Sequence, residues 1–212
     1  VIPLVFCQNR NIDELKKALL SGLGYGSSRE RVFNLDRLIS NFEAGATKSE
    51  LLNEKVLTSE KDSSQERLFS NVDGIYFLTH EGGCGGSKYD SVSLCNLIAG
   101  YINNPNVAGA TILSLGCQHA QISLLEKSLK RIAPDFKKTI FFMEQQKSNS
   151  EEEYLAECIK KTFIGLIEAN KIKRKPAPIS KLTLGLECGG SDGFSGISAN
   201  PVLGFVSDVV VG

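Results

Sequence analysis

The sequence predicts an α/β fold, with a mostly parallel sheet flanked by helices in three layers. Two observations carry this prediction. Short apolar runs alternate along the chain with segments of helical periodicity. The apolar runs also lack the strict polar–apolar alternation of a strand with one solvent-exposed face, so we expect strands buried on both faces. With 212 residues, 42% of them hydrophobic, the chain can bury such a core, and we expect a single α/β domain over residues 1–212.

The predicted strands are short apolar runs, in chain order Ile2 to Phe6, Gly74 to Leu78, Ala110 to Leu115, Thr139 to Met143 and Leu182 to Leu186. Each run is continuous and mostly apolar, which is typical of strands inside a parallel sheet. A weaker candidate runs from Arg31 to Leu35.

Apolar residues that recur three and four positions apart predict helices between the strands. The expected helices run from Ile12 to Leu20, from about Asp90 to Ile102, from about Gln118 to Ile132, and along a stripe from Leu155 to Ile167. Ser150 and Glu153 have the spacing of a capping box ahead of that stripe. A further helix is expected to begin at Asn200-Pro201, because proline suits the first helical position. Together these elements predict Rossmann-like layering.

Two polar stretches interrupt this pattern. Residues 41–70 are rich in charged and hydroxyl side chains, and we expect a helical or loop excursion over the surface rather than a separate domain. The basic run Lys171 to Lys175 precedes Pro176 and Pro178, and we interpret it as a solvated helix end followed by a stiff connector.

Charge and composition exclude several classes of partner. The 24 Lys and Arg residues balance the 24 Asp and Glu residues, whereas nucleic-acid binding needs a clustered basic surface. No unbroken apolar run approaches the length that spans a bilayer. The first residues, Val1 to Cys7, indicate a buried strand rather than a signal peptide, and six cysteines are too few for a disulfide scaffold. We therefore expect a cytoplasmic protein with reduced thiols, without a nucleic-acid or membrane partner.

The cysteines divide into two groups by their place in the predicted fold. Cys95 and Cys158 lie on apolar helical stripes and are interpreted as core residues. The other four lie at or just beyond predicted strand ends, at positions Cys7, Cys84, Cys117 and Cys188. Ligands of open α/β sheets bind at the carboxyl ends of the strands. This edge is therefore the predicted site.

Glycine clusters accompany two of these cysteines. One surrounds Cys84 and comprises Gly82, Gly83, Gly85 and Gly86; the other follows Cys188 and comprises Gly189, Gly190, Gly193 and Gly196. Such clusters are used where the backbone adopts positive φ or approaches a ligand closely. We favour ligand-binding loops over ordinary turns.

Several metal-binding arrangements are compatible with these residues. His80, Cys84, Cys117 and Cys188 could hold one metal ion, because thiolate and imidazole suit iron and zinc. The three thiolates would also fit a [4Fe–4S] cluster with one open iron. The spacing matches no standard zinc-finger or ferredoxin pattern, and a buried small hydrophobic residue remains the alternative for each cysteine. For His119 a capping or surface role is favoured over catalysis.

The densest motif spans residues 188–201. It offers the hydroxyls of Ser191 and Ser195, the carboxylate of Asp192, the amide of Asn200, and the backbone N–H groups of Gly189 and Gly190. Such a loop ahead of a helix suits an anionic ligand with many hydroxyls. It lacks the Gly-Lys-Ser/Thr ending of a P-loop and the Gly-x-Gly-x-x-Gly pattern of a dinucleotide-binding loop, so nucleotide binding is not indicated.

Three stretches resemble the altronate/galactarate dehydratases, a family whose relatives include the large subunit of sulfolactate sulfo-lyase. They are His80 to Gly85, Tyr101 to Cys117, and Cys188 to Gly204. Val1 to Cys7 is also similar to the first strand of the family's catalytic region, whereas Gln118 stands where the family commonly has Glu. The resemblance covers nearly the whole chain and is greatest to altronate dehydratase. It implies a fragment that lacks the N-terminal domain and the C-terminal segment of the full enzyme.

The resemblance implies metal-dependent loss of water from a sugar acid such as D-altronate, giving a 2-keto-3-deoxy acid, with Fe(II) or Mn(II) as cofactor. Galactarate dehydration, sulfite release from sulfolactate and a noncatalytic metal- or cluster-binding module are the alternatives. The metal is expected near Cys84, Cys117 and Cys188. His80 and Asp192 are the expected catalytic residues, and Gly189, Gly190, Ser191, Ser195 and Asn200 are expected to bind substrate. A homo-oligomer is left open, and the isolated fragment need not be active.

Overall fold

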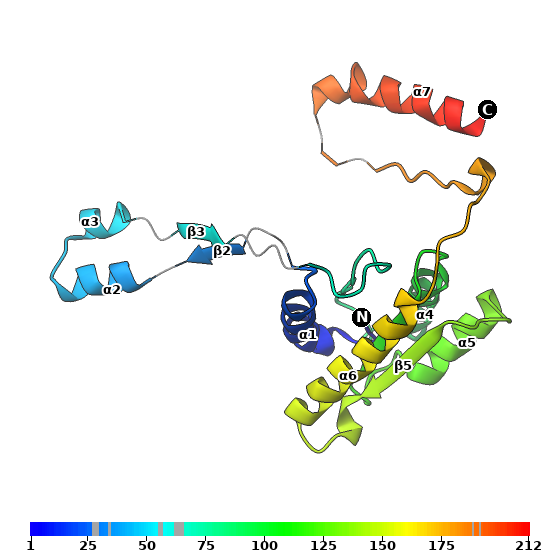
Figure 1. The fold of residues 1–212 in the computed structure, drawn as a ribbon, viewed down its shortest axis with the longest axis horizontal. Helices are drawn as coiled ribbons and strands as arrows, with labels where there is room; N and C mark the ends of the chain where they lie inside the picture. Colours follow the sequence, from blue (N-terminus) through cyan, green and yellow to red (C-terminus); the bar gives the residue numbers. More distant parts are fainter. Residues whose placement is uncertain (27–29, 34, 55–56, 62–65, 188, 191) are drawn as a thin grey trace. The chain divides into compact units, whose positions relative to one another are not determined.

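The computed structural model describes residues 1–26, 30–33, 35–54, 57–61, 66–187, 189–190 and 192–212 (Figure 1). The chain divides into two compact units, Val1–Lys173 and Arg174–Gly212, which we call unit 1 and unit 2. Each unit is described by itself.

A parallel sheet with the strand order β1-β4-β5 forms the centre of unit 1. β1 (Ile2–Pro3) pairs with β4 (Gly109–Ser114), and β4 pairs along its whole length with β5 (Thr139–Glu144). Residues 111–114 of β4 are buried, as expected for a central strand covered on both faces. The predicted α/β fold with a parallel sheet is confirmed.

Helices cover both faces of this sheet (Figure 1). They are α1 (Asn9–Gly22), α4 (Lys88–Asn103), α5 (Ile122–Ile132) and α6 (Glu151–Asn170). Successive residues of a strand point to opposite faces. Ile112 therefore packs with α4 and α5, whereas Leu113 packs with α1 and α6. These two hydrophobic clusters establish the three layers.

Serine hydroxyl groups cap the N-termini of two of these helices. Ser87 and Asp90 form a capping box at the start of α4, with Ser87 N donating to Asp90 Oδ2 at 2.6 Å. Ser150 caps α6 by accepting from Glu153 N at 3.1 Å, as the sequence predicts. The Glu153 carboxylate, however, accepts from Asn149 Nδ2, so only half of the predicted capping box forms.

Two predicted strands of unit 1 differ in the structure. Regular pairing of the first strand ends at Pro3, because the chain turns into the 3₁₀ helix η1 (Phe6–Gln8). The run from Gly74 to Leu78 is extended but is not a strand. Its backbone bonds are to Val1, the residue before β1: Val1 N donates to Tyr76 O at 2.6 Å, and Leu78 N donates to Val1 O at 3.0 Å. This is a parallel pattern, but one residue of overlap does not form a ladder.

The polar excursion has more regular structure than its composition indicates. β2 (Glu30–Phe33) pairs antiparallel with β3 (Leu57–Lys61), and α2 (Asp36–Glu43) and α3 (Lys48–Leu52) lie between them in the chain. The weak strand prediction at residues 31–35 is confirmed as far as Phe33, since residue 34 lies outside the described part. The sequence did not reveal β3, because Leu-Thr-Ser-Glu-Lys has no apolar pattern.

The described residues of unit 2 form a connector, two short 3₁₀ helices and one α-helix. The 3₁₀ helices are η3 (Ile179–Lys181) and η4 (Gly193–Gly196), and the α-helix is α7 (Ala199–Val211), which confirms the predicted helix at Asn200-Pro201. The predicted strand from Leu182 to Leu186 is wrong: this segment is extended and exposed, because no described part of unit 2 offers it a strand partner.

The segment Gly193–Val211 is apolar and long enough, by length and composition alone, to be a candidate membrane span, with a mean hydropathy of 1.4. Its regular α-helix is shorter. The 13 residues of α7 rise about 20 Å, less than the roughly 30 Å of a hydrocarbon core. The absence of a membrane partner stays a prediction.

Candidate functional site

Backbone hydrogen bonds hold three loops together at the carboxyl edge of the sheet in unit 1. Phe6 N donates to Gly82 O at 3.0 Å, and His119 N and Ala120 N both donate to Gly83 O at 3.0 Å. The loops joined in this way carry, in chain order, Cys7, Cys84 and Cys117. Three of the four cysteines that were predicted to lie at strand ends are therefore carried by loops that backbone hydrogen bonds join.

At Gly83 the loop that carries Cys84 packs directly against the backbone of Leu4 and Val5. It is buried with φ +97°, and a Cβ atom at this position would lie 2.0 Å from Leu4 O and 2.6 Å from Val5 Cα. Both the conformation and the space require glycine. Gly85 also has positive φ, at +78°, but a Cβ there would meet nothing within 4 Å. At Gly83, then, the close approach is to the chain's own backbone.

His80 has both ring nitrogens occupied by backbone groups. Nε2 lies 2.8 Å from Pro3 O, and Nδ1 accepts from Gly82 N at 3.1 Å. A neutral imidazole with its proton on Nε2 satisfies both bonds. His80 O accepts from Asn9 Nδ2 at 3.0 Å, while the buried Asn9 Oδ1 has no hydrogen-bond partner in the described residues. In this arrangement His80 fastens the loop of Cys84 to β1.

The loop between β4 and α5 is organised by one buried glutamine. The Gln118 side chain is 1% exposed, donates to Ser114 Oγ at 2.6 Å and accepts from Gly116 N at 2.7 Å. Gly116 has φ +119°, and a Cβ there would lie 2.4 Å from Gln146 Oε1. The helix predicted from about Gln118 begins only at Ile122, because Gln118 holds this turn instead.

The cysteines separate by exposure as the sequence predicts. Cys7, Cys84 and Cys117 are exposed, whereas Cys95 and Cys158 are fully buried in the two hydrophobic clusters. Burial raises the pKa of Cys95 to about 11 and that of Cys158 to about 12. The two helix cysteines are therefore inert core residues, and the thiols accessible to a ligand lie on the joined loops.

Two backbone N–H groups at the N-terminus of α4 are bonded to the chain's own side chains. Ser87 N and Asp90 N are both bonded within the capping box, and these hydrogen bonds from Ser87 lower the pKa of Asp90. A Cβ at Gly86 would lie 2.7 Å from Asp90 Oδ2, so glycine makes room for this carboxylate. The Asp90 carboxylate thus serves as a helix cap at the start of α4.

The other predicted substrate residues lie in unit 2. Asp192 Oδ1 accepts from Phe194 N at 3.1 Å, and Ser195 Oγ donates to Asp192 O at 2.6 Å, so both side chains help form η4. Gly189, Gly190 and Asn200 are exposed. Cys188 and Ser191 lie outside the described residues, and their roles stay predictions.

A metal centre is not assembled within the described residues, where no group of three or more His, Cys, Asp or Glu side chains is placed to hold an ion. Soft thiol donors nevertheless gather on the joined loops, since Cys84 and Cys117 are both exposed there. Thiolates suit iron, whereas Mn(II) prefers oxygen ligands. The two thiols therefore suit iron or zinc better than Mn(II), and Cys188, outside the described residues, is the further thiol that the sequence predicts.

Sequence reasoning missed a set of uncharged polar side chains at the same edge. Gln8 and Asn11 are 0% and 4% exposed, and both donate to Gln145 Oε1, at 2.6 and 3.2 Å. Tyr154 OH donates to Gln8 Oε1 at 3.3 Å, and burial raises the pKa of this phenol. One signal was visible: polar amides directly after two apolar strands, at Gln8 and at Gln145.

Comparison with known families identifies relatives over nearly the whole chain. Residues 1–170 match the family described as D-galactarate dehydratase/altronate hydrolase, second domain, and residues 179–212 match D-galactarate/altronate dehydratase, C-terminal. The boundary between these matches coincides with the boundary between units 1 and 2. The chain belongs to this family.

Curated relatives agree with this assignment. The chain is 33% identical to altronate dehydratase of Escherichia coli and 35% identical to altronate dehydratase of Bacillus subtilis, each over 140 residues, or 66% of this chain. It is 31% identical to galactarate dehydratase (L-threo-forming) of E. coli over 111 residues, or 51% of this chain. The alignments cover only 27%, 27% and 21% of those proteins. No solved structure matches the chain significantly.

Proposed function

We propose that this chain forms part of the catalytic region of a cytoplasmic sugar-acid dehydratase that converts D-altronate to a 2-keto-3-deoxy acid. The observation that supports the proposal is the set of joined loops at the carboxyl edge of the sheet, in a member of this family: hydrogen bonds connect the loop that carries His80 and the accessible thiol Cys84 to the loop that carries the accessible thiol Cys117. Similarity to altronate dehydratases over 66% of the chain favours altronate as substrate.

The reaction removes a proton from the carbon next to the carboxylate and hydroxide from the following carbon. The enediolate formed in this way carries dense negative charge, which must be stabilised where it develops. A bound Fe(II), or alternatively Mn(II), would stabilise that charge and assist the departure of hydroxide. Cys84, Cys117 and Cys188 are the proposed ligands, with a [4Fe–4S] cluster as the alternative.

His80 can take part in proton transfer or metal binding only by exchanging a hydrogen bond. Its Nδ1 lone pair is used by Gly82 N, and its Nε2 proton is directed at Pro3 O. Ligation through Nδ1 would free the Gly82 N–H group, and proton uptake at Nδ1 would do the same. In the proposed enzyme, catalysis by His80 therefore requires the Cys84 loop to shift.

In unit 2, Asp192 is proposed as a second catalytic group. Gly189, Gly190, Ser191, Ser195 and Asn200 are proposed to bind substrate hydroxyls and carboxylate. The hydrogen bonds of Asp192 and Ser195 within η4 support a preformed turn, because they hold the backbone of residues 192–195 in one conformation.

The proposal is tested with the complete protein, purified anaerobically, by metal analysis, visible absorption and product analysis on D-altronate, galactarate and sulfolactate. We expect iron in the protein and fastest turnover of D-altronate. Cys84→Ala and Cys117→Ala should lose both metal and turnover, whereas Cys95→Ala, in the core, should keep both. Visible cluster absorption would indicate the [4Fe–4S] alternative, and a protein that turns over none of these acids would contradict the proposed function.

Galactarate is the second candidate substrate, because the chain is also 31% identical to a galactarate dehydratase. Faster turnover of galactarate than of D-altronate in the same product analysis would establish it in place of altronate.

A further inference from the structure

Gln145 is the first residue of the 3₁₀ helix η2 (Gln145–Lys147), directly after the end of β5. The strands of the sheet are parallel, so Gln145 lies at the same carboxyl edge as the joined loops. The backbone connects it to them directly, since the N–H of the next residue, Gln146, donates to Leu115 O at 3.1 Å. Gln145 is thus a neighbour of the Cys117 loop.

The orientation of the Gln145 amide is set from inside the protein. Its Oε1 accepts two hydrogen bonds, from Gln8 Nε2 at 2.6 Å and from Asn11 Nδ2 at 3.2 Å. Asn11 Nδ2 also donates to Gln8 Oε1 at 2.9 Å, so the two donors hold each other in place. Both lone pairs of Gln145 Oε1 are therefore taken. The half-buried Gln145 side chain can offer a ligand only the N–H groups of its Nε2.

The groups behind Gln145 are uncharged and nearly inaccessible to water. Gln8, Asn11 and Tyr154 are 0%, 4% and 1% exposed. Burial raises the pKa of Tyr154, so its phenol stays a neutral donor to Gln8 Oε1. A buried polar network is costly unless its members are satisfied, and when satisfied it holds one arrangement. The buried side chains of Gln8, Asn11 and Tyr154 therefore hold the side chain of Gln145, which reaches the surface, in one orientation.

We infer that Gln145 is a substrate-binding residue whose Nε2 N–H groups donate to a carboxylate oxygen of the sugar acid. A carboxylate only accepts hydrogen bonds, and a fixed amide that offers only donors matches it, whereas a hydroxyl could equally be bound by an acceptor. The inference rests on the proposed function, because it adds a donor from unit 1 for the acid group of that substrate.

The substitution Gln145→Glu tests this at almost constant shape. Glutamate keeps an oxygen for Gln8 and Asn11 and replaces the outward amide nitrogen with a second oxygen, which repels a carboxylate. In the complete protein we expect the KM for D-altronate to rise about tenfold or more. We expect kcat to change much less and Tm to stay at the wild-type value. Gln145→Met, which loses the donor without repulsion, should raise KM by a smaller factor; it should also lower Tm, because Gln8 and Asn11 lose their acceptor.

Asn96→Asp is the matched control, because it makes the same amide-to-carboxylate change on α4, where Asn96 Oδ1 already accepts from Arg131 at 2.8 Å. It should leave KM and kcat unchanged. If wild type turns over sugar acids and Gln145→Glu keeps the wild-type KM, the inference is overturned while the proposed function stands. A fall in kcat and Tm at constant KM would also overturn it, because Gln145 would then have only a structural role. If wild type turns over no sugar acid, the proposed function itself fails.

Discussion

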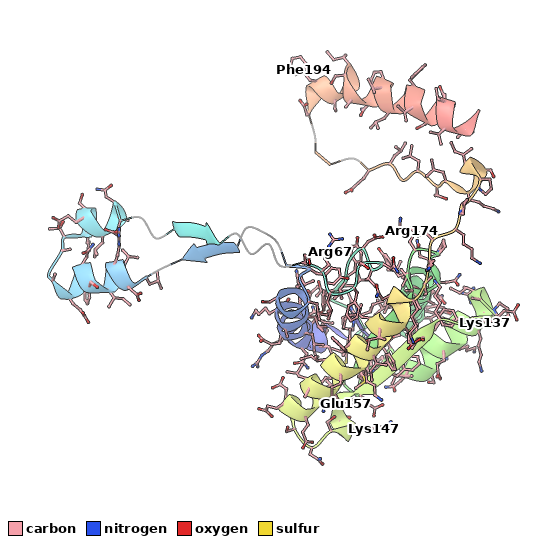
Figure 2. All side chains as sticks on the ribbon, viewed as in Figure 1. Arg67, Lys137, Lys147, Glu157, Arg174 and Phe194 are labelled. Carbon is pink, nitrogen blue, oxygen red and sulfur yellow. The ribbon has the colours of Figure 1, made fainter. Side chains whose placement is uncertain are left out.

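Helices α6 and α7 show how differently the two units use apolar residues. α6 in unit 1 buries Tyr154, Cys158 and Leu166 against the sheet and α1. α7 in unit 2 carries more apolar residues for its length, yet none of its residues is buried, and Phe205 is 71% exposed. In Figure 2 the side chains of unit 1 crowd between its helices and sheet, whereas those of α7 surround a single helix.

The difference shows that apolar content alone does not make a core. A helix gains stability from its apolar face only when another element covers that face. In unit 1 the cover is the sheet, whose alternating side chains supply both hydrophobic clusters. The described residues of unit 2 contain no second α-helix and no sheet to cover α7, and the 3₁₀ helices η3 and η4 leave every residue of α7 unburied. Substitutions matched between the units test this contrast.

The largest expected effect is at Gly83. Gly83→Ala forces a Cβ to within 2.0 Å of Leu4 O at a positive φ, and we expect a loss of about 4 kcal/mol in the free energy of unfolding, measured with urea. Gly204→Ala in α7, where a Cβ meets nothing within 4 Å, should instead be neutral or stabilise its helix by up to about 1 kcal/mol. Equal losses at both positions would remove the contrast.

Truncation of buried and exposed apolar side chains should differ almost as much. Leu113 is 0% exposed on β4, and Leu113→Ala should lower the free energy of unfolding by about 3 kcal/mol by leaving a cavity between α1 and α6. Phe205→Ala should change it by less than about 0.5 kcal/mol. A large loss from Phe205→Ala in the same urea titrations would show that α7 is covered after all.

High pH should destabilise the chain through the two buried thiols of unit 1. Their folded pKa values, about 11 for Cys95 and 12 for Cys158, lie above the value of 9.0 for a free thiol. The stability they contribute is therefore complete below pH 9. It falls above pH 9 by about 1.4 kcal/mol per pH unit per thiol until the folded pKa is reached. Urea titrations between pH 8 and 10.5 measure this slope.

In Cys95→Ala the free energy of unfolding should fall less steeply with pH above pH 9. The slope should be smaller by the contribution of one thiol, because alanine does not titrate. An unchanged slope in this variant would mean that Cys95 ionises as readily in the folded chain as in the unfolded one, contrary to its burial in the cluster on the α4 face.

The smallest expected effect is at the helix caps. Ser150 caps α6 through its bond from Glu153 N, and Ser150→Ala should lower the free energy of unfolding by about 1 kcal/mol. Ser198, at the same position ahead of α7, makes no side-chain capping bond, so Ser198→Ala should cost only a few tenths of a kcal/mol. Thermal unfolding of the two variants compares them, and reversed costs would contradict the capping geometry.

Much of unit 1 was predictable because its signals are local. The strands at residues 110–115 and 139–143 and the helices around Cys95 and Cys158 follow from apolar periodicity, which burial on both faces imposes. Errors occurred where a segment needs a partner. Leu182 to Leu186 has the composition of a buried strand but has no neighbour to pair with, and β3 has polar residues but pairs with β2.

The exposure of the cysteines was predictable, but the hydrogen bonds around the candidate site were not. The exposure of Cys7, Cys84 and Cys117 and the burial of Cys95 and Cys158 follow from their places relative to strands and helices. The hydrogen bonds of His80, by contrast, depend on Pro3, far away in the sequence. The amide network of Gln8, Asn11 and Gln145 likewise joins the two ends of unit 1.

The sequence by itself determined the α/β class, the division of the cysteines and, through its motifs, the family to which the chain belongs. Those features depend on residue type and local spacing. Only the tertiary structure decided that Gly83 is required by the backbone of Leu4 and Val5, that His80 is bonded at both nitrogens, and that Gln145 is held by buried amides. Each of these depends on atoms brought together from distant parts of the chain, which no local pattern encodes.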